Sequence, residues 1–288
     1  DGPPPMHSLS DGIALCLSGG GYRAALFHLG SIWRLNEAGI LSRIDRVSST
    51  SGGSLTGAAL GCAWDRLGWE NGVASRYESE VVIPVRSLTS RSCDVPAIIA
   101  GMLLPGSPAE HAARLYDRHL FHGATLGSLP DAPAFVFNAA NVQTGSLWRF
   151  QKSGMRDWRL GTIVRPDLPV AVAVAGSAAF PPFLSPLRLR FGEEEWEPSS
   201  GEELHRPPFT TDVHLTDGGC YDNLSLETVW KRYRTILVSD ACGRVGDAPR
   251  PRTDWIGHFI RAAELVNAQI SMLRKRQLIG SFAAGARK

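Results

Sequence analysis

Two short stretches rich in glycine and serine carry the residue types needed for acyl transfer. SGGGYRA places Gly19, Gly20 and Gly21 directly after one apolar run, and SSTSGGS places Ser51 after the next. Backbone amides at the start of a helix attract negative charge, so consecutive glycines there can stabilise an oxyanion. A serine held in a tight strand-to-helix turn can act as a nucleophile. Together the two stretches indicate acyl transfer through a serine.

The glycine stretch has other interpretations. GGGYRA also satisfies the dinucleotide fingerprint G-x-G-x-x-A, and Asp45 lies near the end of the next expected strand. A phosphate-binding loop is disfavoured because no GK[ST] follows the glycines. The glycines could also serve only a tight turn that lets a helix pack closely on a sheet. A nucleotide-binding protein of the Rossmann type therefore stays an alternative.

Ser51 is the best nucleophile among the serines of SSTSGGS. A nucleophile elbow needs small residues two positions before and two after the serine, and here these are Ser49 and Gly53. Serine in place of the first glycine of G-x-S-x-G departs from the pattern, so a catalytically silent binding protein is a further alternative. In a purely structural role, Ser51 would cap the helix expected from about Leu55.

A serine nucleophile needs a group that accepts its proton. The chain order Ser, Asp, His of α/β-hydrolases would nominate Asp217 or Asp240 and then His258. His258, however, lies in a long helical pattern, which favours a helix-surface or core histidine. The other source is LTDGGCYDN at 215–223, where Asp-Gly-Gly after an apolar position is ordinarily a turn. Both sources of a base stay open at this point.

The elements that must position these residues alternate between strands and helices. The apolar run 13–17 predicts a buried strand, and helical periodicity from Tyr22 ends at Gly39, a residue typical of a helix C-terminus. Ile44 and Val47 predict a second strand before a second helical pattern. Further central strands are expected in the apolar runs 133–140, 170–176 and 235–241. We therefore predict an α/β fold with a mostly parallel central sheet and helices on both faces, which brings both loops to one sheet edge.

The domain organisation follows from the interruptions in this pattern. Residues 1–11 are polar and proline-rich and are expected to form a flexible tail, and 12–288 form one domain. Proline, glycine and short helical patches at 70–131 predict an insertion or cap, and the acidic stretch 192–210 predicts a surface loop. No apolar run approaches the roughly 20 residues needed to cross a bilayer.

Composition limits the classes of partner. The 288 residues are 43% hydrophobic, and 30 Lys and Arg against 28 Asp and Glu give a net charge of +2, which argues against nucleic acid. The five cysteines are widely spaced without a CxxC pair. They favour a cytoplasmic or peripheral-membrane location, while secretion stays open because many secreted enzymes lack disulfides. The sequence does not indicate an oligomeric state.

The order of the motifs resembles a known family. SGGGYRA, SSTSGGS and TDGGCYDN look like the three signature blocks of patatin-like phospholipases, a family that includes the catalytic domain of cytosolic phospholipase A2. A fourth block, AGSAAFPPF at 175–183, resembles the family's Ala-Ser-x-Ala-x-Pro segment. The resemblance covers about residues 12–245 and implies a three-layer α/β/α fold.

The resemblance also implies a mechanism that uses a Ser–Asp dyad without histidine or metal and needs no cofactor. Ser51 would be the nucleophile, Asp217 the base, and the amides of Gly19, Gly20 and Gly21 the oxyanion donors. An aspartate with its ordinary pKa of about 3.9 is a weak base, so Asp217 should be shielded from water. Arg23 is expected to steady the glycine loop or to meet a substrate phosphate. Asn223 is expected to organise the turn after the Asp-Gly-Gly, and Asp222 to face solvent.

The family hydrolyses acyl esters of lipids and simple esters, so the expected partner is a lipid or ester, with peripheral membrane contact. The apolar stretch 97–105 is expected to form a core helix, to line an acyl-chain channel or to touch a membrane. The basic residues at 273–276 are expected either to interact with the end of their own helix or to meet anionic lipid heads.

Overall fold

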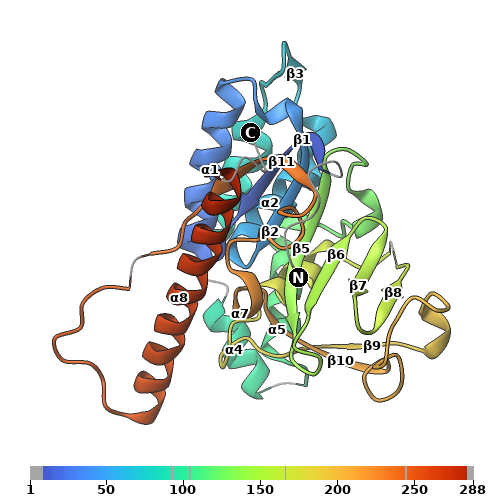
Figure 1. Ribbon diagram of the computed structural model, residues 1–288, viewed down its shortest axis with the longest axis vertical. Coiled ribbons are helices and arrows are strands. Elements are labelled where there is room, and N and C mark those ends of the chain that lie inside the picture. Colours follow the sequence, from blue (N-terminus) through green and yellow to red (C-terminus); the bar gives the residue numbers. More distant parts are fainter. Residues whose placement is uncertain (1–8, 92–93, 104, 166, 244, 284–288) are drawn as a thin grey trace.

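A nine-stranded mixed sheet forms the centre of the molecule, with helices packed around it (Figure 1). The computed structural model describes residues 9–283 except 92, 93, 104, 166 and 244. Four adjacent strands run parallel, in the order β11 (Tyr233–Ser239), β1 (Ser10–Leu17), β2 (Ile44–Thr50) and β5 (Ala134–Asn141). Five antiparallel strands extend the sheet from β5: β6 (Leu147–Gln151), β7 (Gly154–Asp157), β8 (Gly161–Ile163), β9 (Leu187–Arg190) and β10 (Asp212–Asp217).

The predicted α/β class and the parallel centre are confirmed. The motif-bearing helices follow their strands as expected, α1 (Gly21–Glu37) after β1 and α2 (Gly52–Ala63) after β2. Gly39 has φ 66 just beyond α1, the left-handed conformation expected of a glycine after a helix. The first strand begins at Ser10, inside the tail expected at 1–11, of which residues 1–8 lie outside the described part.

The antiparallel strand β10 was not anticipated, and it decides the position of the site. On one edge of β5, β2 pairs up to Thr50 opposite Asn138, and β10 then pairs from Asp217 opposite Ala139. The end of β2 and the end of β10 therefore meet on neighbouring residues of β5. This register brings together residues that lie far apart in the chain.

The strand predicted at 170–176 is wrong, because this segment is the helix α6 (Val170–Ser177). Periodicity cannot distinguish a strand from a helix when every residue is apolar and the whole segment is buried. Here Pro169 occupies the N-cap position, and α6 packs against β5 and α2 in the interior. A helix that is buried on all sides needs no polar face, so VAVAVAG suits either structure.

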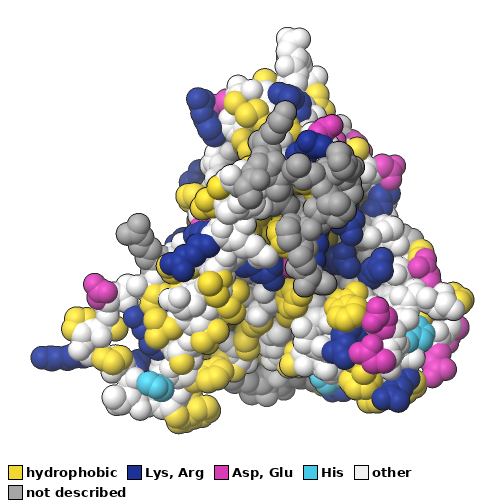
Figure 2. All heavy atoms as spheres, in the orientation of Figure 1, with side chains coloured by type: hydrophobic (Ala, Val, Ile, Leu, Met, Phe, Trp, Pro, Cys, Tyr) yellow, Lys and Arg dark blue, Asp and Glu magenta, His cyan; other side chains and the backbone are white. Residues whose placement is uncertain are grey.

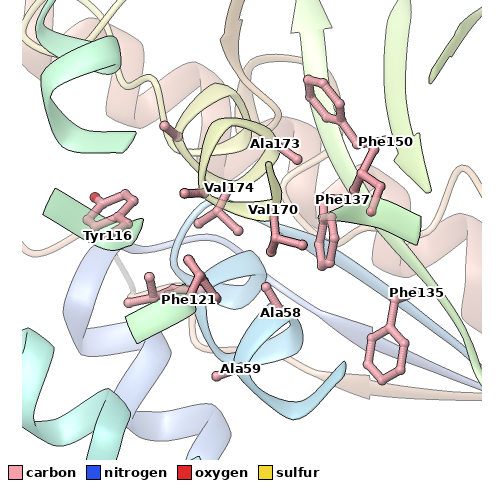
Figure 3. Packing of buried hydrophobic residues seen from close by; sticks show 14 of the residues in the cluster. Ala58, Ala59, Tyr116, Phe121, Phe135, Phe137, Phe150, Val170, Ala173 and Val174 are labelled. Atoms are coloured by element: carbon pink, nitrogen blue, oxygen red, sulfur yellow. The ribbon is translucent and has the colours of Figure 1, made fainter. Parts of the chain in front are cut away.

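The segment 70–131 is mostly helical and contributes to the main hydrophobic core. Figure 3 shows Tyr116 and Phe121 beside Val174 of α6, with Ala58 of α2 close by. Its regular elements are β4 (Val73–Ala74), the π-helical turns Glu78–Val82 and Asp117–Phe121, α3 (Ile83–Thr89), α4 (Asp94–Leu103), α5 (Pro108–Tyr116) and the 3-10 turn Leu126–Ser128. Whether it acts as a cap stays a prediction.

The last helix, α8 (Trp255–Ala283), lies along the outside of the molecule (Figure 1). Many of its apolar side chains are exposed, including Trp255 and Phe259, and Figure 2 shows hydrophobic side chains over this helix. Across the described residues, no helix is long and apolar enough to span a membrane. The remaining short elements are β3 (Trp69–Glu70), α7 (Gly219–Asp222), and the 3-10 turns Leu41–Arg43, Trp64–Arg66 and Glu193–Glu195.

Candidate active site

Ser51 stands in a strained turn between β2 and α2. Its backbone angles are φ 53 and ψ −123, a conformation that residues with a Cβ rarely adopt. Ser51 occupies the N-cap position of α2, yet its side chain makes no capping hydrogen bond. The capping role considered from the sequence therefore does not account for the hydroxyl, which lines a cavity while the residue is only 7% exposed.

Asp217 meets the Ser51 side chain at the end of β10. The Ser51 hydroxyl donates a hydrogen bond to the Asp217 carboxylate, and the Gly219 amide donates another to Oδ1 at 2.7 Å. Asp217 is 4% exposed, and this burial raises the pKa of its carboxyl to about 6 although both hydrogen bonds lower it. A buried carboxylate with this pKa is a better proton acceptor near neutral pH than an exposed one.

The three glycines of the first loop have different surroundings. The Gly19 amide donates a hydrogen bond to the Asn223 carbonyl at 3.0 Å, so this amide is not available to bind an oxyanion. Gly20 and Gly21 have φ 137 and 65, and both line the same cavity as Ser51. Their amides stand at the N-terminus of α1, where no acceptor is available within the helix. Of the three expected oxyanion donors, Gly20 and Gly21 therefore stay candidates and Gly19 does not.

The cavity beside these groups has a volume of about 500 Å³. Its wall is largely apolar beyond the Ser51 hydroxyl, and α8 adds two polar side chains, Glu264 and Asn267. From the apolar stretch 97–105, Ile98 lines the cavity, while the side chains of 102–104 lie outside the described part. The other apolar or aromatic lining residues include Tyr22, Leu55, Tyr116, Val174, Ala178, Phe180, Phe183 and Leu184.

Comparison with known proteins assigns the chain to a family. The sequence pattern that defines patatin-like phospholipases matches residues 15–230. The chain belongs to the patatin-like phospholipase family. Among similar solved structures, human GIVD cytosolic phospholipase A2 is 13% identical with a TM-score of 0.48, covering 78% of this chain and 42% of that one. VipD from Legionella pneumophila is 16% identical with a TM-score of 0.36, covering 74% of this chain and 46% of that one.

The chain spans less than half the length of each of these two solved structures. A comparison with curated protein sequences gave no match.

Close backbone packing explains the two glycines that follow Ser51 in this patatin-like chain. A Cβ at Gly52 would lie 2.0 Å from the Gly21 carbonyl oxygen, and a Cβ at Gly53 would lie 2.5 Å from the Leu17 carbonyl oxygen. The start of α2 therefore lies directly on the backbone of the glycine loop. Glycine is required at both positions because the partner atoms belong to the backbone and cannot move aside as a flexible side chain could.

Substituting Gly53 should therefore damage the patatin-like fold at its site. Gly53→Ala is expected to lower the free energy of unfolding by about 3 kcal/mol or more, because overpacking displaces backbone rather than a side chain. Gly30→Ala in α1 is the matched control: a Cβ there meets no atom within 4 Å, and alanine should stabilise the helix by up to about 1 kcal/mol. Urea unfolding measures the free energy of unfolding of both variants. Equal stability of the two variants would contradict the tight packing.

His28 supports the glycine loop of this patatin-like site and was missed in the sequence. It is buried on α1, where Nε2 donates to the Ser18 carbonyl at 2.8 Å and Nδ1 accepts from the Ser239 hydroxyl at 2.8 Å. Burial lowers the pKa of His28, so the ring is neutral and suits this pair of bonds. The sequence signal for this role was its position one residue before Leu29, which lies on the inward-facing stripe of the helix.

The sequence expectation for Asp222 is wrong. Asp222 is buried rather than solvent-facing, and its carboxylate accepts hydrogen bonds from the amides of Leu224 at 3.1 Å and Glu227 at 2.7 Å. These bonds organise the turn after α7. A carboxylate can replace solvent in this way when backbone donors surround it.

Asn223 contributes at a different place, between the two halves of the site. Its Nδ2 donates to Cys242 Sγ at 3.0 Å, and its Oδ1 occupies the space that a Cβ at Gly19 or Gly219 would need. The carboxamide therefore lies between the glycine loop and the Asp217 turn. This explains why both neighbouring positions carry glycine.

The residues of a histidine triad do not come together. His258 is exposed on α8 and does not line the cavity. Asp240 forms an ion pair with Lys275, and Arg274 pairs with Glu227 at 2.6 Å, so two of the basic residues at 273–276 hold α8 against the body. Arg23 is exposed and lines the cavity, with its guanidinium close to Gly243.

Proposed function

We propose that this protein is a serine acyl hydrolase that cleaves carboxylic acyl esters of lipids through an acyl-Ser51 intermediate, with Asp217 as the base. Membership of the patatin-like phospholipase family supports lipid hydrolysis in general. The observation that carries the finer proposal is the hydrogen bond between the Ser51 hydroxyl and the buried Asp217 carboxylate. Gly20 and Gly21, which line the same cavity, supply the oxyanion donors in this proposal.

In the first half of the reaction, Ser51 Oγ attacks the ester carbonyl carbon while its proton passes to Asp217. The carbonyl oxygen becomes negative and accepts hydrogen bonds from the Gly20 and Gly21 amides. Collapse of the tetrahedral intermediate breaks the bond to the alcohol, which leaves with the proton from Asp217. The products of this half are a free alcohol and an acyl group on Ser51.

In the second half, a water molecule attacks the acyl-Ser51 carbonyl and gives its proton to Asp217. The same two amides stabilise the second oxyanion. Cleavage of the acyl bond returns the proton to Ser51 Oγ and releases a carboxylic acid. The apolar wall formed by residues such as Val174, Phe180 and Phe183 would hold the acyl chain. Peripheral contact with a lipid surface and contact of Arg23 with a substrate phosphate stay predictions.

The pH dependence should follow the ionisation of Asp217. The base must be deprotonated to accept the serine proton, so kcat/KM for a short p-nitrophenyl ester should fall as pH drops below about 6. Below that pH the decrease should approach about tenfold per unit, because one proton inactivates the base. Initial rates between pH 4.5 and 8 measure this decrease in kcat/KM. An acidic limb centred near pH 4 would mean that burial does not raise the pKa of the catalytic carboxyl.

A fluorophosphonate probe tests the covalent step directly. The probe should label one residue, Ser51, and abolish ester hydrolysis in proportion to labelling, which peptide mapping by mass spectrometry would establish. Hydrolytically active protein without label on Ser51 would remove the proposal. Thermal stabilisation by NAD or NADP in protein without esterase activity would instead favour the nucleotide-binding alternative.

A further inference from the structure

The C-terminal end of α6 contacts the nucleophile turn through one buried side chain, Ser177. Ser177 is 0% exposed, and its hydroxyl donates to the Asn138 carbonyl at 2.6 Å. The same oxygen accepts the Ser51 amide at 3.0 Å and lies 2.8 Å from Ser54 Oγ. A single side-chain oxygen thus connects the nucleophile turn to the central strand β5.

The backbone of the same segment contacts the base. The Ser177 carbonyl accepts the Gly218 amide at 3.1 Å, and the Ala179 carbonyl accepts the Asp217 amide at 2.9 Å. Residues 177–179 therefore hold the amides of Ser51, Asp217 and Gly218 at once. Ser51 and Asp217 lie 166 residues apart in the sequence, so residues 177–179 connect two segments that are distant in the chain.

The Ser51 amide needs such an acceptor for two physical reasons. A buried amide without an acceptor is costly, and the turn leaves the Ser51 amide without a regular acceptor in β2 or α2, although the Ser51 carbonyl accepts from the Ser54 amide. The strained positive-φ conformation of Ser51 also persists only when surrounding contacts hold it. The Ser177 hydroxyl meets both needs, since it can accept the amide while it donates to a carbonyl that cannot move.

We propose that Ser177 is a positioning residue that sets the Ser51 hydroxyl against the Asp217 carboxylate. It touches neither substrate nor reacting atoms and acts through the Ser51 amide. This inference rests on the proposed function, because it assigns Ser177 a role in the same ester hydrolysis. It predicts an effect on turnover that exceeds the effect on folding.

The test compares Ser177→Ala with Ser54→Ala in the full chain. Both remove one buried hydroxyl from the same cluster, but only Ser177 contacts the Ser51 amide. For a p-nitrophenyl ester, Ser177→Ala should lower kcat about 10- to 100-fold with KM within about twofold, because reacting groups lose their alignment. Ser54→Ala should keep kcat within about threefold while losing similar thermal stability.

The pH profile gives a readout that a merely structural role would not move. The hydrogen bond from Ser51 lowers the pKa of Asp217, so loosening it should shift the acidic limb of kcat/KM to higher pH in Ser177→Ala. The acidic limb of kcat/KM for Ser54→Ala should lie at the same pH as that of the wild-type protein. Similar kcat values and unshifted limbs in both variants would overturn the positioning role.

A third variant covers the case in which Ser177→Ala does not fold. Ser177→Cys keeps a group that can accept and donate weakly in a somewhat larger side chain, and it should give kcat between wild type and Ser177→Ala, with a partly shifted acidic limb. Wild-type turnover in a folded Ser177→Cys variant, with an unshifted limb, would again overturn the inference. Wild-type protein that neither hydrolyses esters nor reacts with fluorophosphonate would refute the proposed function itself, which is a separate outcome.

Discussion

Replacing Ser51 with alanine is expected to reduce hydrolysis of a short p-nitrophenyl ester by about a thousandfold or more, because the variant lacks the group that forms the acyl intermediate. The fold should survive, since alanine keeps the Cβ, and the hydroxyl makes no capping hydrogen bond. Circular dichroism should therefore match that of the wild-type protein, and the melting temperature should fall by no more than a few degrees, because the hydrogen bond to Asp217 is lost. Initial rates, together with fluorophosphonate labelling, measure the loss.

His258→Ala provides the control for this experiment. The exposed imidazole lies on α8 and does not line the cavity, so the variant should keep most of the wild-type rate. A large loss in the His258 variant, as well as in Ser51→Ala, would replace the dyad with a Ser-Asp-His triad. His258→Ala separates the two mechanisms, because only the triad predicts that this variant loses activity.

Asp217→Asn is expected to reduce hydrolysis by a comparable factor while making the protein more stable at neutral pH. The amide cannot accept the serine proton, which accounts for the loss of activity. The gain in stability follows from the pKa of Asp217, which burial raises from 3.8 to about 6. Between these values the native state binds more protons than the unfolded state, so stability falls as pH rises through this range.

Above about pH 6 the ionised carboxylate lowers the stability of the wild-type protein by an amount on the order of 2 to 3 kcal/mol. Asparagine has no charge to bury, so urea unfolding at pH 7.5 should show Asp217→Asn to be the more stable protein. The difference should shrink as the pH falls from 6 toward 4, because the wild-type carboxyl then takes up a proton. A constant difference over this range would contradict the titration of a buried carboxyl.

Asp222→Asn is the matched control for Asp217→Asn. Asp222 is also buried and burial also raises the pKa of its carboxyl, but it does not line the cavity. It binds the amides of a turn instead of the Ser51 hydroxyl. Its variant should therefore keep hydrolysis within about tenfold of the wild-type rate, since it removes no reacting group. Equal inactivation of the two variants would point to structural damage rather than loss of the base.

The two glycine-rich loops could be predicted as parts of the site because the constraints on them act within a few residues. A strained turn requires small neighbours, and a helix N-terminus that approaches another backbone requires glycine. These requirements can be read directly in SGGGYRA and SSTSGGS, and the contacts of Gly52 and Gly53 now explain them. The parallel centre of the sheet was predictable for a similar reason, because two strand-to-helix units follow each other in the chain.

The segments that were misjudged depend on what surrounds them. Residues 170–176 are apolar throughout, and only their burial between other elements makes them a helix. Asp222 is charged and follows a turn, which favours exposure until backbone amides close around its carboxylate. His28 carries no local signal of its role, and the block AGSAAFPPF marks Ser177 without indicating what it does, since each residue acts through a partner distant in the chain.

The amino-acid sequence by itself determined the family, the α/β class and the identity of the turn that carries Ser51. Only the tertiary structure decided that Asp217 reaches this serine, that the Gly19 amide bonds the Asn223 carbonyl, and that Ser177 contacts the turns of both Ser51 and Asp217. The physical reason is the range of the interactions. Turn and helix-start preferences act over a few residues, whereas strand register, burial and the pKa values that burial shifts arise only when distant segments pack together.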